Sequence, residues 1–280
     1  MIEFWIADLK SDEKAFNVPC SYGVWEFHQR DDYDNVLHKK EEGQCAATYY
    51  AFNETLGFNS PDTEFSQAIG ELIDACLILS FLNGQCVTPE RCTPQSELQF
   101  LQLGDSFMRS RAISGFNPLT LGRSYSEIFS VGMPSMSSTF TERRMRLFLS
   151  HWVSGLTCFS LEDIFLSIGV QMDIVKQCEI AATGRRLDYY PGMVSASNRY
   201  QLQQLSYDYK KMRNDIVHEG RLSGSNYSNK TKSDCADVVA LALNWIDSYV
   251  CAALNIGRPS ASRWNPRIIE AGLPALSFHA

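Results

Sequence analysis

The sequence lacks the short motifs by which several large enzyme classes are identified. It has no glycine-rich phosphate-binding loop and no G-x-S-x-G nucleophile elbow, which argues against P-loop nucleotide hydrolases and α/β-hydrolases. Its nine cysteines are an odd number, and the spacing of Cys76, Cys86 and Cys92 fits no paired zinc or redox pattern. We therefore expect free thiols in a reducing cytoplasm, with neither a metal site nor a cofactor.

Long uninterrupted apolar runs are also missing. Residues 1–9 carry acidic side chains where a secretory signal would carry basic ones, and no long apolar stretch follows them. The best candidate for a membrane span, residues 238–256, is interrupted by Asn244 and Asp247. That interruption is typical of a buried helix, so we expect no membrane association.

Charge is distributed unevenly along the chain. The net charge of −7 argues against a general nucleic-acid coat protein. Residues 1–75 contain 15 acidic and 5 basic side chains, a balance of −10, whereas residues 76–280 contain 17 acidic and 20 basic side chains, a balance of +3. The larger C-terminal part can therefore accommodate a phosphate backbone.

Short apolar runs characterise the N-terminal region, which we place at residues 1–138. Runs of aromatic and β-branched residues between polar turns predict strands near 2–6, 22–27 and 46–52. Helical spacing of apolar residues predicts a helix over 64–83. Pro134 to Ser138 has the composition of a linker. We expect a mixed α/β region with a sensing or partner-binding role.

Regular helical patterns begin after residue 138. Thr139 and Glu142 form a capping-box pattern ahead of a first helix whose apolar positions run from 145 to 156. The same periodicity predicts three more helices with apolar positions at 161–175, 205–216 and 238–249, separated by polar loops at 185–198 and 221–232. The expected fold class is therefore mainly α, with a four-helix bundle at 139–257 and a tail at 258–280.

The candidate catalytic residues lie at the end of the third of these helices, where Arg213, Asn214 and His218 precede Gly220. An arginine near a histidine is the minimal equipment for metal-free RNA cleavage, because the histidine can move the 2′-OH proton while the guanidinium holds the phosphate. Side chains five positions apart on one helix point about 140° apart. Two helix ends that meet across a twofold axis can complete a joint site, so we expect a homodimer.

Spacing alone does not single out this pair, since Arg144 and Arg146 precede His151 at comparable distances. His151 lies in mid-helix beside Trp152, where a core or boundary histidine is expected. His218 instead lies at a helix end, where its side chain can reach a cleft.

A purely structural role also fits the helix-end residues. Histidine in the last turn interacts favourably with the helix dipole, and Arg213 can pair with Asp208 or Asp215. Asp215 lies three positions before His218, so it can alternatively orient that imidazole. For the dimer contact, the apolar residues Trp152, Trp245 and Tyr249 are candidates.

Two loops offer candidate substrate-binding residues. The first interleaves cations with aromatic rings, and from it we select Arg185, Arg186 and Tyr189 to hold phosphate and stack a base. The second is rich in Ser, Asn and Gly, and from it we select Lys230 and Lys232. Ordinary solvated loops would have the same composition.

Arg213-Asn214 followed by His218, at the end of the third helix of a four-helix bundle, resembles the RN-x₃-H signature of the HEPN superfamily, and more closely the ApeA-like HEPN domains of prokaryotic defence proteins. The helical patterns at 152–153, 159–166 and 209–212 add to this resemblance, which covers about residues 140–256. It implies a dimeric, metal-independent endoribonuclease that leaves 2′,3′-cyclic phosphate and 5′-hydroxyl ends, in antiphage defence or toxin-like growth arrest. Arg213 and His218 would be catalytic and Asn214 supporting.

One departure from the family pattern is Glu219, an acid where some toxin members have a polar residue. Its charge near an anionic substrate would weaken RNA affinity or mark a regulated form. The alternative function is a non-catalytic HEPN module that senses a nucleotide or docks a partner protein. Beside RNA, the candidate partners are therefore a regulatory protein and a nucleotide trigger.

Overall fold

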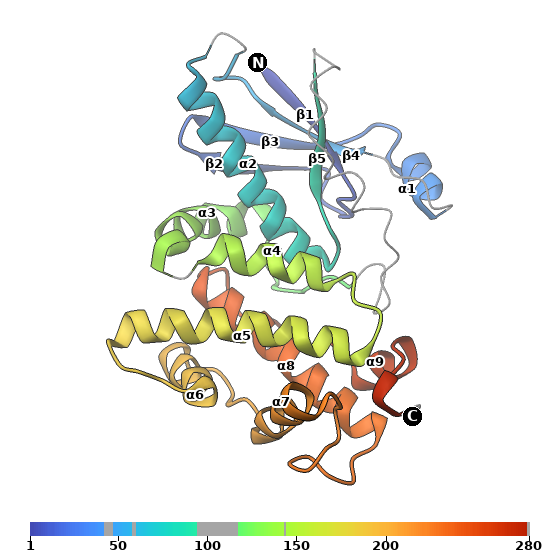
Figure 1. Cartoon of the computed structure of the whole chain (residues 1–280). Coiled ribbons are helices and arrows are strands. Elements are labelled where there is room, and N and C mark those ends of the chain that lie inside the picture. Colours follow the sequence, from blue (N-terminus) through green and yellow to red (C-terminus); the bar gives the residue numbers. More distant parts are fainter. Residues whose placement is uncertain (42–46, 58–59, 94–116, 143, 279–280) are drawn as a thin grey trace. The chain divides into compact units, whose positions relative to one another are not determined.

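The computed structural model describes residues 1–41, 47–57, 60–93, 117–142 and 144–278 (Figure 1). The chain divides into two compact units: the described residues up to Ser137 form the first unit, and those from Ser138 onward form the second. The expectation of a mainly α fold with a mixed N-terminal region is confirmed, because helices dominate and the strands all lie in the first unit.

The first unit is built on one antiparallel sheet with the strand order β2-β3-β4-β1-β5. Alternation of buried and less buried residues, as in β1, places one face of the strands in the core. The sequence predicted three of these strands and missed two. The bounds are β1 (Ile2–Ala7), β2 (Ala15–Cys20), β3 (Gly23–Gln29), β4 (Ala47–Asn53) and β5 (Thr88–Thr93).

The helices of the described part of this unit are α1 (Tyr33–Glu41), α2 (Asp62–Asn83) and the first part of α3 (Tyr125–Glu142). The prediction of a helix over 64–83 is confirmed by α2, which ends at Gly84 in the left-handed conformation. Packing against the sheet is marked by a hydrogen bond from Trp25 Nε1 to the Ala68 carbonyl, 3.2 Å long. The predicted linker at 134–138 is wrong, since Pro134 lies inside α3.

The second unit is entirely helical within the described residues. Its central helices are α5 and α8: α5 packs against α4, α6 and α8, and α8 also contacts α7 and α9 (Figure 1). The bounds are α4 (Met145–Gly155), α5 (Leu161–Thr183), α6 (Tyr189–Tyr200), α7 (Tyr207–Glu219), α8 (Lys232–Ala253), α9 (Pro266–Gly272) and the short 3₁₀ helix η2 (Leu276–Phe278).

The four predicted helices of this unit correspond to α4, α5, α7 and α8, but one predicted start is wrong. Thr139 and Glu142 lie within α3, so they do not cap the next helix. At the start of α4, Arg144 adopts a left-handed conformation and forms no side-chain capping bond. Other starts follow the expected chemistry: Ser160 accepts the Asp163 amide, and Thr231 forms a capping box with Asp234.

Two further predictions for this unit are corrected. The polar loop at 185–198 is in large part a helix, α6, and Gly192 lets this helix approach α5 closely: a Cβ at Gly192 would lie 3.1 Å from Lys176 Cβ. The predicted tail, at 258–280, folds back onto the unit over its described residues 258–278, where Ile269 and Leu273 are buried. Leu161 donates its amide hydrogen to the Pro274 carbonyl.

Among the described residues, two helices, α2 and α8, are long and apolar enough to cross a membrane by length and composition alone. Most of each apolar stretch is buried inside the protein, as in core helices of folded domains. The candidate dimer contacts Trp152, Trp245 and Tyr249 are core residues as well, which makes that assignment wrong.

Candidate active site at the end of helix α7

Helix α7 holds the three candidate catalytic residues between well-defined ends. Ser206 accepts the Asp208 amide at the start of the helix. At the other end Gly220 has φ 70° and donates its amide hydrogen to the Ile216 carbonyl. Because glycine takes this left-handed conformation without steric cost, the helix ends immediately after Glu219. The predicted helix end is confirmed.

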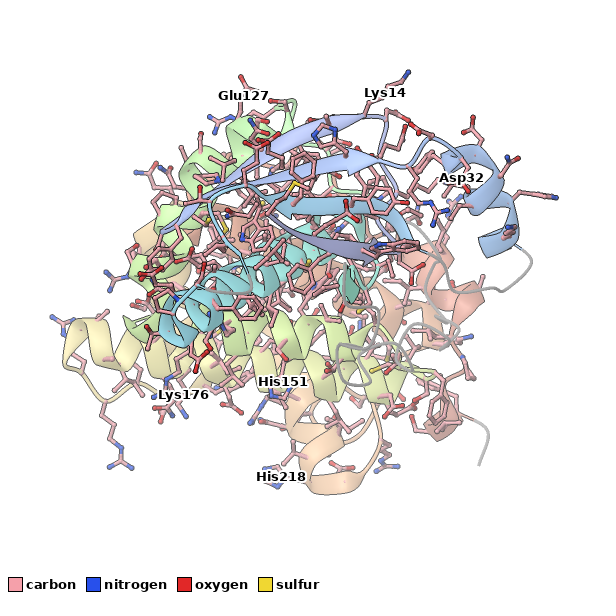
Figure 2. All side chains as sticks on the ribbon, turned by 90° about the horizontal axis from the view of Figure 1, so that it is seen from above. Lys14, Asp32, Glu127, His151, Lys176 and His218 are labelled. Atoms are coloured by element: carbon pink, nitrogen blue, oxygen red, sulfur yellow. The ribbon has the colours of Figure 1, made fainter. Side chains whose placement is uncertain are left out.

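His218 is exposed, and Figure 2 shows it projecting outward from the last turn of α7. Asn214, one turn earlier, is half-buried. Within the described residues neither side chain forms a hydrogen bond, and His218 has no ion pair. Both are therefore available to an external ligand. His151, the comparison histidine, is half-buried in α4 as expected.

Arg213 lies on a different side of α7 and stacks on an aromatic ring. Its guanidinium carbon is 3.9 Å from the centroid of Tyr189, on α6. One guanidinium nitrogen is 3.7 Å from a carboxylate oxygen of Asp173, on α5. Asp208 pairs with Lys211 instead, so the predicted Arg213–Asp208 pair is wrong. The structure thus brings together Arg213 and Tyr189, two residues that were selected separately from the sequence.

A second tyrosine holds this aromatic platform in place. The hydroxyl oxygens of Tyr189 and Tyr209 are 2.8 Å apart, and the two rings stack with centroids 6.1 Å apart. Burial raises the pKa of both hydroxyls well above the ordinary value, so both rings stay neutral. The sequence predicts Tyr209 as a core position and as part of the 209–212 pattern, and its spacing of four from Arg213 was the available signal for this contact.

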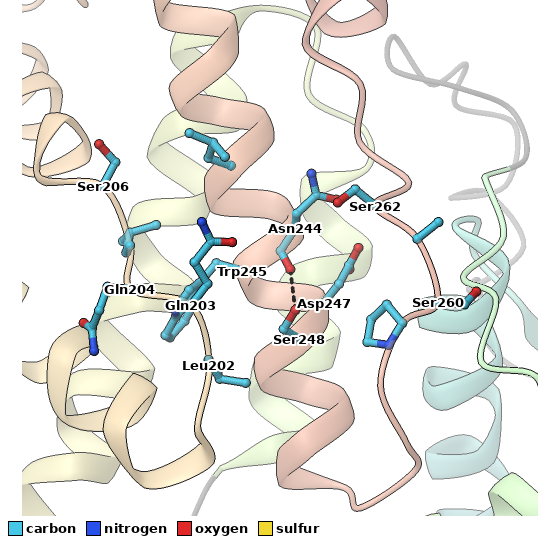
Figure 3. Close-up of a pocket in the computed structure, with 14 residues that line it drawn as sticks. Leu202, Gln203, Gln204, Ser206, Asn244, Trp245, Asp247, Ser248, Ser260 and Ser262 are labelled. Atoms are coloured by element: carbon cyan, nitrogen blue, oxygen red, sulfur yellow. Dashed lines mark hydrogen bonds between the residues drawn. The ribbon is translucent and has the colours of Figure 1, made fainter.

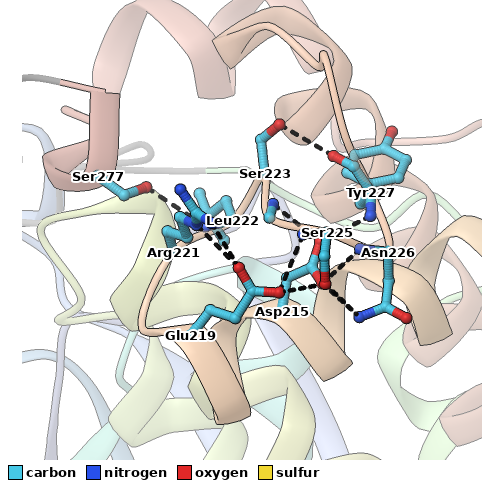
Figure 4. A network of polar contacts seen from close by, with 10 residues as sticks. Asp215, Glu219, Arg221, Leu222, Ser223, Ser225, Asn226, Tyr227 and Ser277 are labelled. Carbon is cyan, nitrogen blue, oxygen red and sulfur yellow. Dashed lines mark hydrogen bonds and ion pairs between the residues drawn. The ribbon is translucent and has the colours of Figure 1, made fainter.

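Asp215 organises the loop after α7 and interacts with neither His218 nor Arg213, so both expectations for it are wrong. Its buried carboxylate accepts the backbone amides of Gly224, Asn226 and Tyr227 at 2.6–2.9 Å, and the Asn226 side-chain amide at 2.7 Å (Figure 4). Burial alone would raise the pKa of Asp215, but these hydrogen bonds lower it below the usual range.

Glu219, the departure from the family pattern, is engaged by the same loop. Its carboxylate accepts the Ser225 amide at 2.9 Å and the Ser225 hydroxyl, and it pairs with Arg221 at 2.6 Å (Figure 4). The Ser225 and Arg221 hydrogen bonds lower the pKa of Glu219. A Cβ on Gly224 would lie 2.7 Å from Glu219 Oε2 and 2.8 Å from Asp215 Cγ, so a larger residue there would displace these carboxylates. Because Arg221 compensates its charge, Glu219 presents little free negative charge to a substrate.

The remaining predicted substrate-binding residues lie apart from this cluster. Arg185 and Arg186 are exposed between α5 and α6. Lys230 stacks over Tyr227 at 5.1 Å and lies 3.7 Å from an Asp234 carboxylate oxygen, and Lys232 is the half-buried first residue of α8. Within the described residues, no hydrogen bond or ring contact links any of these four side chains to Arg213 or His218.

A cavity of about 390 Å³, which the sequence did not indicate, lies between residues 202–206, helix α8 and residues 259–262 (Figure 3). Its polar lining consists mainly of neutral amides and hydroxyls, such as Gln203 and Ser206. The charged lining residue is Asp247, which forms a buried ion pair with Arg263 at 2.7 Å. Because the described residues that line this cavity include no free cation, it is poorly suited to a phosphate.

The chain matches no protein-family model, no curated protein and no solved structure. The candidate site is therefore defined by its own geometry. Its parts are an exposed histidine at a glycine-capped helix end, an arginine on a tyrosine platform, and a loop fixed by two carboxylates.

Proposed function

We propose that the protein is a metal-independent endoribonuclease of the HEPN type, which cleaves RNA to 2′,3′-cyclic phosphate and 5′-hydroxyl ends in antiphage defence or toxin-like growth arrest. The observation that carries the proposal is the arrangement of His218 and Arg213 on α7. One offers an exposed imidazole without a side-chain partner among the described residues, and the other offers a half-buried guanidinium on an aromatic platform.

In the reaction, His218 accepts the proton of a ribose 2′-OH, and the freed oxygen attacks the adjacent phosphorus. The bond from phosphorus to the 5′ oxygen then breaks, and the leaving oxygen takes a proton from water, while the imidazolium of His218 returns its proton to solvent. Arg213 neutralises the charge that builds on the pentacovalent phosphorus, which can contribute several kcal/mol in a dry site. Asn214, on the same side of α7 as His218, supports the substrate. No metal is required.

The contacts of Arg213 are compatible with phosphate binding. Its ion pair with Asp173 is long, at 3.7 Å, and both side chains are partly exposed. Such a pair contributes little stability, so a phosphate can replace the carboxylate while the guanidinium stays on Tyr189. Arg213 and His218 still diverge by about 140° around α7, which is why we propose that two subunits combine their α7 ends.

Replacement of the histidine tests this proposal. We expect His218→Ala to lower cleavage of cellular RNA by about 10²–10⁴-fold, the usual effect of removing a general base. Its melting temperature should remain close to that of the unmodified protein, because His218 is exposed and unbonded in the described structure. His151→Ala, a histidine change on α4, serves as the matched control. Full activity of His218→Ala would end the proposal.

The second candidate function is a non-catalytic HEPN module that senses a nucleotide or docks a partner protein. It is favoured by the same contacts of Arg213, whose guanidinium is held by Tyr189 and Asp173 on the side of α7 away from His218. Growth after induction separates the two functions. An active ribonuclease should arrest growth, and Arg213→Ala should relieve the arrest. Equal growth of both strains, with no new 5′-hydroxyl RNA ends, would favour the binding module.

A further inference from the structure

One side of α7 presents a row of polar and aromatic side chains that ends at His218. Tyr207, Lys211, Asn214 and His218 follow one another at intervals of four, three and four residues. Eleven helical positions amount to three turns plus about 20°, so Tyr207 and His218 lie almost in line along the helix, about 16 Å apart. Lys210 lies beside this row, one turn after Tyr207.

This row faces away from the core. Tyr207 is 51% exposed and His218 is exposed, and Lys211 and Asn214 between them are half-buried. On the opposite side of the helix, Tyr209, Met212 and Ile216 are buried. A ring as large as tyrosine that is half exposed on a helix, next to cations, is a feature of surfaces that stack nucleic-acid bases.

Neighbouring side chains contact the Tyr207 ring and restrain its orientation. Tyr190, on α6, meets it edge-on with centroids 5.2 Å apart and planes at 83°. Lys210 Nζ lies 3.2 Å from the Tyr207 hydroxyl and 5.0 Å from the ring centroid, and Lys211 Nζ lies 5.9 Å from that centroid. Lys211 also pairs with Asp208. The ring and both ammonium groups are thus gathered at the start of α7.

We propose that single-stranded RNA binds along this row, which we call the α7 stripe: Tyr207, Lys210, Lys211, Asn214 and His218. A base stacks on Tyr207, Lys210 and Lys211 hold phosphates, and the strand continues along the helix to His218. This inference rests on the proposed function and names its substrate as unpaired RNA.

The geometry favours a single strand over a duplex. Bases in a duplex are stacked on each other and cannot reach an exposed ring, whereas unpaired bases can. The length of the stripe, about 16 Å, accommodates several nucleotides at the roughly 3.4 Å spacing of a stacked strand. The neutral cavity beside Ser206 offers no free cation to compete for the backbone.

Binding can be measured separately from cleavage with a short fluorescent RNA whose 2′ positions are all methylated, so that it cannot be cut. We expect anisotropy titrations of the full chain to show binding to this strand and much weaker binding to its duplex. Tyr207→Ala should weaken binding about tenfold, the effect of losing one stacked base, and Tyr207→Phe should retain it. Lys210→Gln with Lys211→Gln should lower the salt dependence by about 1.4, since each phosphate contact contributes about 0.7.

Matched variants remove the same groups elsewhere. Phe159→Ala removes an exposed ring, and Lys14→Gln with Lys39→Gln removes two exposed cations from the first unit; neither change should affect binding. RNA binding that is unaltered in the α7 stripe variants would overturn the inference, whether or not the protein cleaves RNA. So would the absence of any binding to the strand, which is the result expected if the stripe docks a protein. Stripe-dependent binding without cleavage would uphold the inference and reject the ribonuclease.

Discussion

Asp215 fixes the loop that follows α7. Both of its oxygens accept hydrogen bonds from the loop at 224–227, and the side chain is fully buried. The negative charge of Asp215 therefore fixes the loop at 224–227 through these hydrogen bonds. A carboxylate in this role stabilises the loop after α7, so its loss should lower the stability of the fold.

We predict that Asp215→Asn lowers the free energy of unfolding by about 3 kcal/mol. The new amide group would replace one oxygen and face the two N–H donors bound to it, which are those of Gly224 and Tyr227 at Oδ2 or both of Asn226 at Oδ1. Denaturant unfolding measures the change. Asp188→Asn, an exposed acid that forms no capping bond on α6, should alter stability by less than about 0.5 kcal/mol. Equal stability of the two variants would contradict the role assigned to Asp215.

The lowered pKa of Asp215 makes this contribution dependent on pH. Hydrogen bonds in the folded state hold the pKa below that of the unfolded chain, about 3.9. The stabilisation is thus fully present above that value and is lost as the pH falls through the lower folded pKa. We expect the stability difference between the unmodified protein and Asp215→Asn to shrink below about pH 4, as measured by unfolding titrations across pH. A stability difference between the two proteins that grows as the pH falls would contradict this prediction.

At the scale of elements, α6 connects the candidate site to the core. It supplies the Tyr189 platform for Arg213 and is tied to α5 by Glu179, which accepts hydrogen bonds from Ser195 and Arg199. Because the Tyr189 ring already restrains the Arg213 guanidinium, this side chain would lose little conformational entropy on binding a phosphate.

Replacement of the platform tests this restraint. We predict that Tyr189→Ala lowers RNA cleavage about tenfold, in line with the loss of one cation–π contact, and that Tyr189→Phe retains the ring and most of the activity. The Phe variant loses the hydroxyl contact to Tyr209, so melting curves should accompany both assays. If Tyr189→Ala and Tyr189→Phe lose activity equally, the hydroxyl rather than the ring positions Arg213.

The same helix shows where sequence patterns stop being informative. Helices α4, α5, α7 and α8 carry large apolar residues at helical spacing and could be predicted. Helix α6 buries Gly192, Met193, Ala196 and Ser197, mostly small residues whose packing leaves no apolar period to detect. Its Pro191-Gly192 pair also has the composition of a turn.

The candidate site, like the helices, could be predicted from the sequence only in part. The glycine-ended helix placed His218 at an exposed end, because a left-handed cap has a sequence signature. The partners of Asp215 and Glu219 were not predictable, since they are backbone amides and serines of a loop that approaches only in the folded chain. Likewise, the Arg213 platform depends on the packing of α6 against α7, for which one sequence contains no signal.

At the scale of the whole molecule, the question is how Arg213 and His218 could act on the same phosphate, since they point in different directions from one α7 helix. The two side chains point about 140° apart, and within the described residues no contact joins them. Beside His218, Val217 is an apolar side chain that is 52% exposed. An exposed apolar group at this helix end is suited to contact a second copy of the chain.

The last prediction is that catalytic sites are shared between two subunits, each site taking Arg213 from one chain and His218 from the other. Chains with Arg213→Ala and chains with His218→Ala should each be inactive alone. Mixed after unfolding and refolding together, they should regain activity, because a heterodimer contains one site with both groups intact. At equal concentrations and with random assortment, half of the dimers are mixed, and one of the two sites in each mixed dimer is intact. Recovery should therefore approach about a quarter of the unmodified rate. Sedimentation of the unmodified protein supplies the independent measurement. A monomer that still cleaves RNA, or no recovery in mixtures that demonstrably form heterodimers, would rule out the shared site and would require Arg213 to leave Tyr189 during the reaction.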